Sequence, residues 1–218
     1  GPLLYCAWQV VYRGVYAEVL DLANLKARME RVVGDVNAWY DAFISLGTNF
    51  GPEFRGIEEI TYGESELLAK VTLNDKRADA NVYRLHPGHI DSALQAGVAL
   101  VAGAHNLPTG TALPFALESL KIYDTCDESL FVWVRFASGS NERLIKLDID
   151  LVNADGAVCV QFQGFSSRPY KPSTEQNKNN ALGGYGAIVA SPHWVKEPWI
   201  APRTSQHQNL AQNIVVLG

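Results

Sequence analysis

Cysteine, excess charge and long apolar runs are all scarce in this chain, and each shortage excludes a class of protein. The 218 residues include three cysteines without paired spacing, which excludes a disulfide scaffold and a thiolate zinc site. The net charge of −5 comes from scattered residues, so neither nucleic acid nor an anionic membrane surface is an expected partner. No apolar run has spanning length and no signal peptide is recognisable. We therefore expect a cytoplasmic protein with reduced thiols.

The remaining composition is that of a folded globular protein, with 47% apolar and 19% charged residues. Apolar positions at helical spacing predict a long helix over residues 87–104 and shorter helices over 22–29 and 36–46. A long helix among antiparallel strands indicates an α+β fold, with a curved sheet wrapped around that helix. Aromatic and β-branched runs predict the strands over 3–20, two within 57–73, and 117–123, 130–138, 144–152 and 157–167.

The start of the long helix carries the most informative side chains. Pro87 suits the first helical turn, where its missing N–H costs nothing, and it disfavours helix at His86 before it. Asp91 and Gln95 are four residues apart, so they project from one face of the helix. A carboxyl group at the edge of a core gains a raised pKa and can hold a proton for an acid step. The alternatives are a capping or dipole role for Asp91 and a solvated Gln95.

The spacing of His86, Pro87, Asp91 and Gln95 resembles the second half of a polyketide synthase dehydratase domain. Residues 47–56 resemble the Gly-x-x-Tyr-Gly-Pro-x-Phe-x-Gly loop of that family, and residues 113–123 resemble the strand after its central helix. The resemblance covers about residues 8–170. It implies a single hotdog fold, one half of the double hotdog that family members form.

The same resemblance implies a domain organisation. Residues 1–16 would be a residual strand of a missing N-terminal hotdog, and residues 17–170 the dehydratase-like hotdog. The polar and glycine-rich stretch 171–187 reads as a linker. Residues 188–218 are too few for a core of their own and resemble the start of a ketoreductase structural subdomain.

A dehydratase of this family acts on a β-hydroxyacyl chain that phosphopantetheine holds as a thioester on an acyl carrier protein. A histidine of the first hotdog removes the α-proton, and an aspartate of the second assists departure of the β-hydroxyl. Neither a cofactor nor a metal is implied, and neighbouring synthase domains are expected partners. The implied catalytic residues are Asp91 and Gln95, and the implied substrate-binding residues are Phe50, Gly51, Pro52, His86, Pro87 and Leu94.

Two departures from the family pattern stand out. None of the five histidines begins the His-x-x-x-Gly-x-x-x-x-Pro pattern, and Phe50 replaces the usual tyrosine. We therefore expect a truncated domain whose dehydration is impaired unless a partner half supplies the histidine. The alternative is a non-catalytic scaffold or carrier-protein-binding module of the synthase. An uncovered sheet edge would favour self-association or pairing with another hotdog.

Three histidines have other expected places. His86 should hydrogen-bond to the backbone, as loop histidines often do. His89 is expected to be exposed, and the alternative is a place at the mouth of the pocket. His105 should lie near the C-terminus of the long helix, where a partly cationic imidazole is favourable.

Overall fold

The computed structural model of the chain describes residues 8–10, 17–29, 31–32, 35–73, 83, 85–104, 106–110, 112–169 and 213–215. The chain divides into two compact units, Gly1–Gly14 with Ser173–Gly218, and Val15–Pro172. In the first unit, strand β1 (Trp8–Val10) pairs antiparallel with strand β10 (Asn213–Val215). The expected linker over 171–187 lies outside the described residues, and so does the tail over 188–218 apart from residues 213–215.

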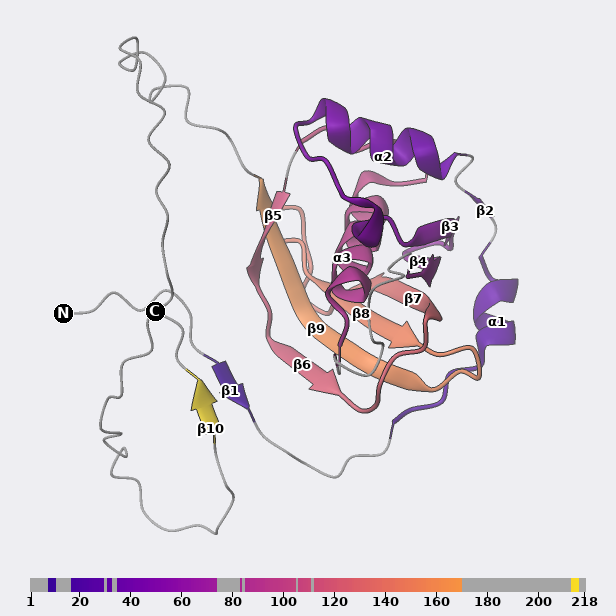
Figure 1. The fold of residues 1–218 in the computed structure, drawn as a ribbon. Coiled ribbons are helices and arrows are strands. Elements are labelled where there is room, and N and C mark those ends of the chain that lie inside the picture. The colour runs from indigo at the N-terminus through magenta and orange to yellow at the C-terminus, as the bar shows by residue number, and fades with distance from the viewer. Residues whose placement is uncertain are drawn as a thin grey trace, which may run out of the picture. The chain divides into compact units, whose positions relative to one another are not determined.

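The second unit is built on one antiparallel sheet of eight strands within the described residues (Figure 1). Seven strands follow one another in the order β2-β3-β4-β7-β8-β9-β5, and β6 also pairs with β9. The strands are β2 (Arg31–Val32), β3 (Ile57–Tyr62), β4 (Glu66–Thr72), β5 (Ala112–Ala116), β6 (Ser119–Ile122), β7 (Ser129–Phe136), β8 (Leu147–Val152) and β9 (Val158–Pro169).

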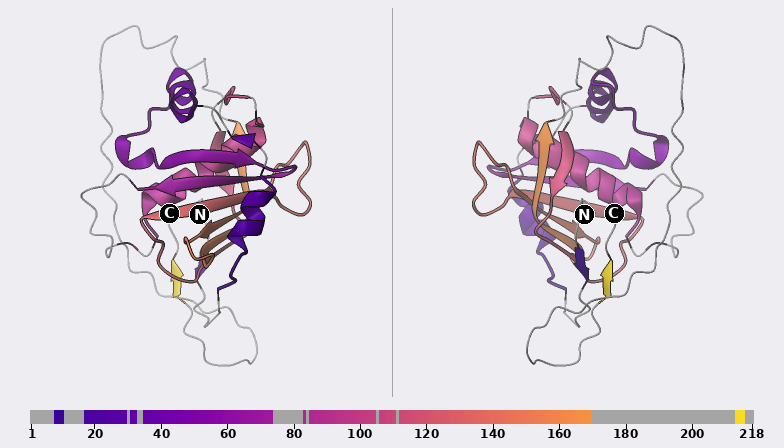
Figure 2. Two further views of the ribbon diagram at one scale, coloured as in Figure 1. Left: turned by 90° about the vertical axis from the view of Figure 1, so that its right-hand side faces the viewer. Right: turned by 90° about the vertical axis from the view of Figure 1, so that its left-hand side faces the viewer.

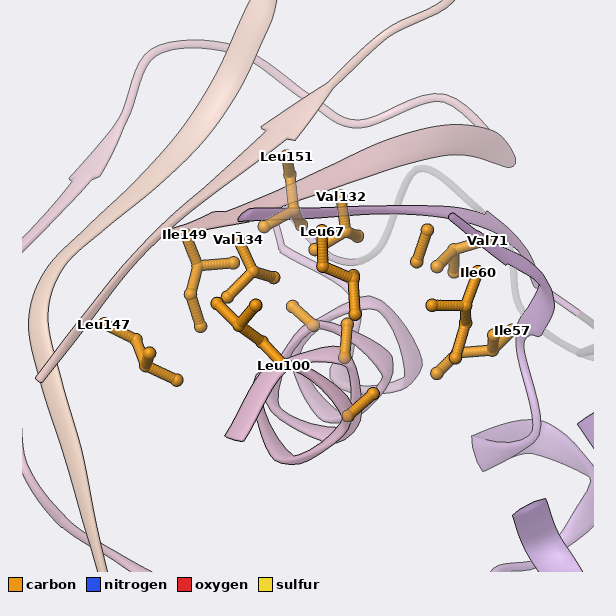
Figure 3. Packing of buried hydrophobic residues seen from close by; sticks show 14 of the residues in the cluster. Ile57, Ile60, Leu67, Val71, Leu100, Val132, Val134, Leu147, Ile149 and Leu151 are labelled. Carbon is orange, nitrogen blue, oxygen red and sulfur yellow. The ribbon is translucent and has the colours of Figure 1, made fainter. Parts of the chain in front are cut away.

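Helix α3 (Pro87–Ala102) lies in the concave face of this sheet, which curves around it in the views of Figure 2. Alternate residues of the strands turn inward, because successive strand side chains point to opposite faces. Figure 3 shows aliphatic side chains of several strands converging on the helix. The expectation of an α+β fold with a sheet wrapped around a long helix is therefore confirmed. The inward residues of the central strands β7 and β8 are Leu130, Val132, Val134, Leu147, Ile149 and Leu151, all buried.

The shorter helices begin where the sequence predicts, and they end one or two residues before the predicted bounds. Asp21 caps α1 (Leu22–Ala27), accepting a hydrogen bond from the backbone N–H of Asn24 at 2.9 Å. Helix α2 (Val36–Ser45) is followed by Gly47 with a φ of +86°, a left-handed conformation that glycine adopts without a steric penalty. A 3-10 turn, η1 (Pro52–Phe54), then leads into β3.

The region after α3 differs from the single strand over 113–123 that the family resemblance implied. Two strands occupy it, and both pair with β9: β6 with residues 160–163 and β5 with residues 166–169. Pro114 lies in β5 next to a register shift. Proline cannot donate to a ladder and is confined to sheet edges and bulges, which is where β5 lies.

Two further expectations concern cysteines and membranes. Cys126 and Cys159 are unbridged thiols, as expected, with their Sγ atoms 2.9 Å apart. Cys6 lies outside the described residues. No helix among the residues described is long and apolar enough to cross a membrane.

Candidate active site

The candidate site lies on the first two turns of α3, where Asp91 and Gln95 project from one face. The side-chain amide of Gln95 donates to Asp91 Oδ2 at 2.8 Å, so the structure brings the two expected catalytic residues together. The same amide nitrogen donates to the backbone carbonyl of Phe54 at 2.9 Å. Gln95 is buried rather than solvated. One amide therefore links the carboxyl group to the loop before β3.

Burial controls the protonation of Asp91. It raises the pKa of this carboxyl above the ordinary value, and the hydrogen bond from Gln95 opposes the rise. Burial disfavours a charged carboxylate, while donation to the carboxylate favours it. The carbonyl oxygen of Gln95, Oε1, is itself buried without a hydrogen-bond partner among the described residues. The pair thus offers a carboxyl group able to retain a proton and an adjacent acceptor.

The loop from Phe50 to the start of β3 is fixed by contacts to its neighbours. Arg55 Nε donates to the Phe50 carbonyl at 2.9 Å. The Phe50 ring packs edge-on against Phe43 of α2 at 5.1 Å between ring centroids. This aromatic contact makes Phe50 part of the wall of the core rather than a polar group of the site.

Tyr40 of α2 belongs to the same cluster, and sequence reasoning missed it. Its hydroxyl oxygen accepts a hydrogen bond from the backbone N–H of Ile57 at 3.2 Å. Burial, with a smaller contribution from the negative charge of Asp91, raises the pKa of Tyr40 to about 12. The Arg55 guanidinium lies 5.4 Å from the Tyr40 ring centroid. The one signal in the sequence that could have located Tyr40 was its place in the helix predicted over 36–46.

The histidines beside the site are engaged with the backbone. His86 caps α3, with Nδ1 accepting from the N–H of Gly88 at 3.1 Å, which confirms its expected structural role. His89 was expected to be exposed, and this was wrong: it is 1% exposed, with Nε2 3.4 Å from the Glu128 carbonyl oxygen. Burial lowers the pKa of His89 to about 4. His105 lies outside the described residues.

The remaining expected substrate-binding residues serve visible structural roles. Gly51 precedes η1, and its carbonyl accepts from the N–H of Phe54 at 2.9 Å. Pro52 and Pro87 open their helices, and Leu94 packs partly buried against the core. Their part in substrate binding stays a prediction.

A cavity of about 270 Å³ lies elsewhere, between α1 and the strand β7. It is lined by Leu20, Asp21, Asn24, Leu25, Arg28 and Trp133, and Asp91 is not among these residues. Within the described part of the chain, no group of histidine, cysteine or carboxylate side chains is arranged to hold a metal ion.

Comparison with known sequences finds similarity to polyketide synthases and to their dehydratase domains. The sequence model of the family described as polyketide synthase dehydratase N-terminal domain matches residues 17–177. Polyketide synthase PksN of Bacillus subtilis (strain 168) is 35% identical over 152 residues, which cover 68% of this chain and 3% of that protein. The chain thus spans a small part of this curated relative. The family description names an N-terminal domain, whereas the Asp91 motif predicts the second hotdog, so that assignment stays a prediction.

Solved structures show the same likeness. A trans-AT polyketide synthase dehydratase domain from Brevibacillus brevis is 33% identical, with a TM-score of 0.64. The match covers 72% of this chain and 55% of that one. The dehydratase of the CurK module of the curacin synthase is 25% identical with a TM-score of 0.62, over 71% of this chain and 53% of that one. A histidine-to-phenylalanine variant of the CurK domain is described as inactive. These likenesses confirm the expected hotdog fold.

Proposed function

We propose, because this chain belongs to the polyketide synthase dehydratase family, that it provides the acid half of a dehydratase site. The substrate would be a β-hydroxyacyl thioester carried by phosphopantetheine on an acyl carrier protein. The observation that carries the proposal is the buried hydrogen bond from Gln95 to Asp91, whose pKa burial raises. A carboxyl group whose pKa is raised above its ordinary value is better suited to act as a general acid than a fully solvated one.

The reaction divides into two proton transfers. A base removes the α-proton of the acyl chain, and electrons move into a new α,β double bond. The C–O bond to the β-hydroxyl breaks, and Asp91 gives its proton to the departing oxygen, which leaves as water. The carbonyl oxygen of Gln95 is an acceptor that could orient the hydroxyl group before it leaves.

The base would come from a histidine on another hotdog half. His86 Nδ1 is used by the cap of α3, and the pKa of buried His89 is lowered to about 4. The inactive histidine variant of the CurK domain supports a need for such a residue. We therefore expect dehydration by this chain alone to be impaired.

The place for a second hotdog is the outer edge formed by β5 and β6. Both strands pair with β9, and their apolar side chains are exposed. Leu113 and Phe115 are 48% and 52% exposed. An uncovered edge that carries apolar side chains favours pairing with another sheet. The occupant is either a second copy of this chain or another segment of the synthase.

Incubation with a β-hydroxyacyl carrier protein tests the catalytic proposal. Turnover, followed as loss of water by mass spectrometry, should require addition of a hotdog half that carries the family histidine. In that mixture Asp91→Asn should reduce the rate roughly 100-fold or more, the usual contribution of a positioned acid. Asp127→Asn is the control, since Asp127 is exposed in the loop between β6 and β7. A fully active chain without the added half, or an active Asp91→Asn variant, contradicts the proposal.

A second candidate function is a non-catalytic module that holds the carrier protein. Phe50 favours it, because this residue lacks the hydroxyl of the usual tyrosine and packs against Phe43. Binding of the carrier protein without turnover, even in the presence of the histidine-bearing half, would identify this function. For residues 188–218 we propose the start of a ketoreductase structural subdomain, whichever of the two functions holds.

A further inference from the structure

The backbone of residues 54–57 is held from two sides by side chains of different helices. From α3, the Gln95 amide donates to the Phe54 carbonyl at 2.9 Å. From α2, the Tyr40 hydroxyl accepts from the Ile57 N–H at 3.2 Å. Tyr40 and Gln95 are 4% and 3% exposed, so water does not readily replace either bond. The position of this short segment therefore depends on both helices.

The two bonds of Gln95 are coupled because they share one nitrogen. Its two N–H groups are directed to the Phe54 carbonyl and to Asp91 Oδ2. If the Phe54 carbonyl moves, the amide must rotate or lose a partner, and its donation to Asp91 weakens. Any group that fixes residues 54–57 thereby also fixes the amide at the carboxyl group.

We infer that Tyr40 is a positioning residue, whose hydroxyl holds residues 54–57 so that Gln95 keeps its hydrogen bond to Asp91. The inference rests on the proposed role of Asp91 as the acid. Tyr40 acts through the Ile57 N–H, the Phe54 carbonyl and the Gln95 amide, and it need not touch the substrate. Arg55 supports the same arrangement, since it donates to the Phe50 carbonyl and lies over the Tyr40 ring.

The pKa of Asp91 measures this coupling without substrate or turnover. Its side-chain carboxyl ¹³C shift can be followed by NMR through a pH titration, with Asp91→Asn to assign the resonance. Tyr40→Phe should raise the pKa by about half a unit, because a weaker bond from Gln95 favours the carboxylate less. Gln95→Leu should raise it as well. In the Gln95→Leu background, Tyr40→Phe should add nothing.

Tyr62→Phe is the matched control. Tyr62 is also buried and its hydroxyl also bonds to backbone, donating to the Ala99 carbonyl at 3.0 Å near the far end of α3. This variant loses a comparable hydrogen bond and should leave the Asp91 pKa unchanged. An equal shift in Tyr62→Phe would mean that general loosening is responsible, and a Tyr40→Phe shift that persists without Gln95 would mean direct contact. Either result overturns the inference, as does an unshifted Tyr40→Phe variant.

Hydrogen exchange in the unsubstituted protein provides a test that does not depend on a variant folding. The Ile57 N–H should exchange slowly, and the two side-chain amide protons of Gln95 should be similarly protected. Exchange of the Ile57 N–H at the rate of an exposed loop amide would refute the inference. These measurements stand apart from the proposed function, which fails if Asp91→Asn leaves turnover with the histidine-bearing half unchanged.

Discussion

At the scale of single residues, His89 ties the stability of the domain to pH. Its ring is buried on α3, Nδ1 has no hydrogen-bond partner in the described part of the chain, and burial lowers its pKa to about 4 from an ordinary value of 6.5. Between these two values the unfolded chain binds a proton that the folded chain does not. The contribution of His89 to the free energy of unfolding is therefore fully present above about pH 6.5, and it is lost as the pH drops toward 4.

Replacing His89 with glutamine should flatten this dependence. One pKa unit corresponds to about 1.4 kcal/mol, so the imidazole accounts for at most about 3.5 kcal/mol of the loss across this range. Urea unfolding at several pH values, compared between the unsubstituted protein and His89→Gln, isolates the histidine. Asp91, whose raised pKa acts in the opposite sense, is common to both proteins. Equal pH dependence of the two unfolding curves would contradict this account.

Sequence reasoning at this scale succeeded where partners are close in the chain. The Asp91–Gln95 pair follows from helical spacing, and the cap by His86 follows from the proline after it. Tyr40 was missed because its partner Ile57 is 17 residues away, across a loop. His89 was misplaced because the spacing that locates a residue on a helix does not say how closely the sheet covers that face.

At the scale of elements, the approach of β3 and β4 to α3 depends on Gly56. A Cβ atom at this position would lie 2.7 Å from Ser92 Oγ and 3.1 Å from the Thr72 carbonyl oxygen. The Gly56 carbonyl also accepts from the N–H of Thr72 at 2.8 Å, so the backbone has little room to move. Close packing therefore explains why the loop motif over 47–56 ends in a glycine, Gly56.

Gly56→Ala should destabilise the domain by about 1–3 kcal/mol, the usual effect of overpacking. The matched control is Gly110→Ala, because nothing lies within 4 Å of a Cβ atom placed there. Thermal or urea unfolding of both variants measures the difference. If both alanines had the same small effect, close packing at Gly56 would be ruled out.

The elements themselves were predicted well where capping and turn chemistry are local. Asp21 and Gly47 mark the helix boundaries, and the Asp155-Gly156 turn separates β8 from β9. The two-residue strand β2 carries too short a pattern to detect. The break between β5 and β6 is set by pairing with β9 and by Pro114, and long-range pairing leaves no periodic signal.

At the scale of the whole molecule, the exposed apolar edge predicts association. The Arg168 guanidinium lies 3.4 Å from the Phe115 ring centroid, so this edge is partly covered by a charged side chain. Phe115→Ser should weaken binding to a second hotdog about tenfold, because one large apolar contact is lost. Leu144→Ser is the control, since Leu144 is 43% exposed beside the β7–β8 turn.

Sedimentation equilibrium of this chain alone, and of its mixture with a histidine-bearing hotdog half, measures the association. A monomer in both experiments at high concentration would argue against a docking edge. Equal weakening by Phe115→Ser and Leu144→Ser would place the contact elsewhere.

The link that Gln95 makes between α3 and the loop before β3 also bears on the construction of chimeric synthases. A crossover point between residues 57 and 86 would join the loop of one parent to the helix of another, and the amide would meet a carbonyl it did not evolve beside. Crossovers outside residues 36–95 keep the loop, α2 and the amide from a single parent. Recombined domains joined outside residues 36–95 should retain a correctly placed Asp91 carboxyl group more often than domains joined within these residues.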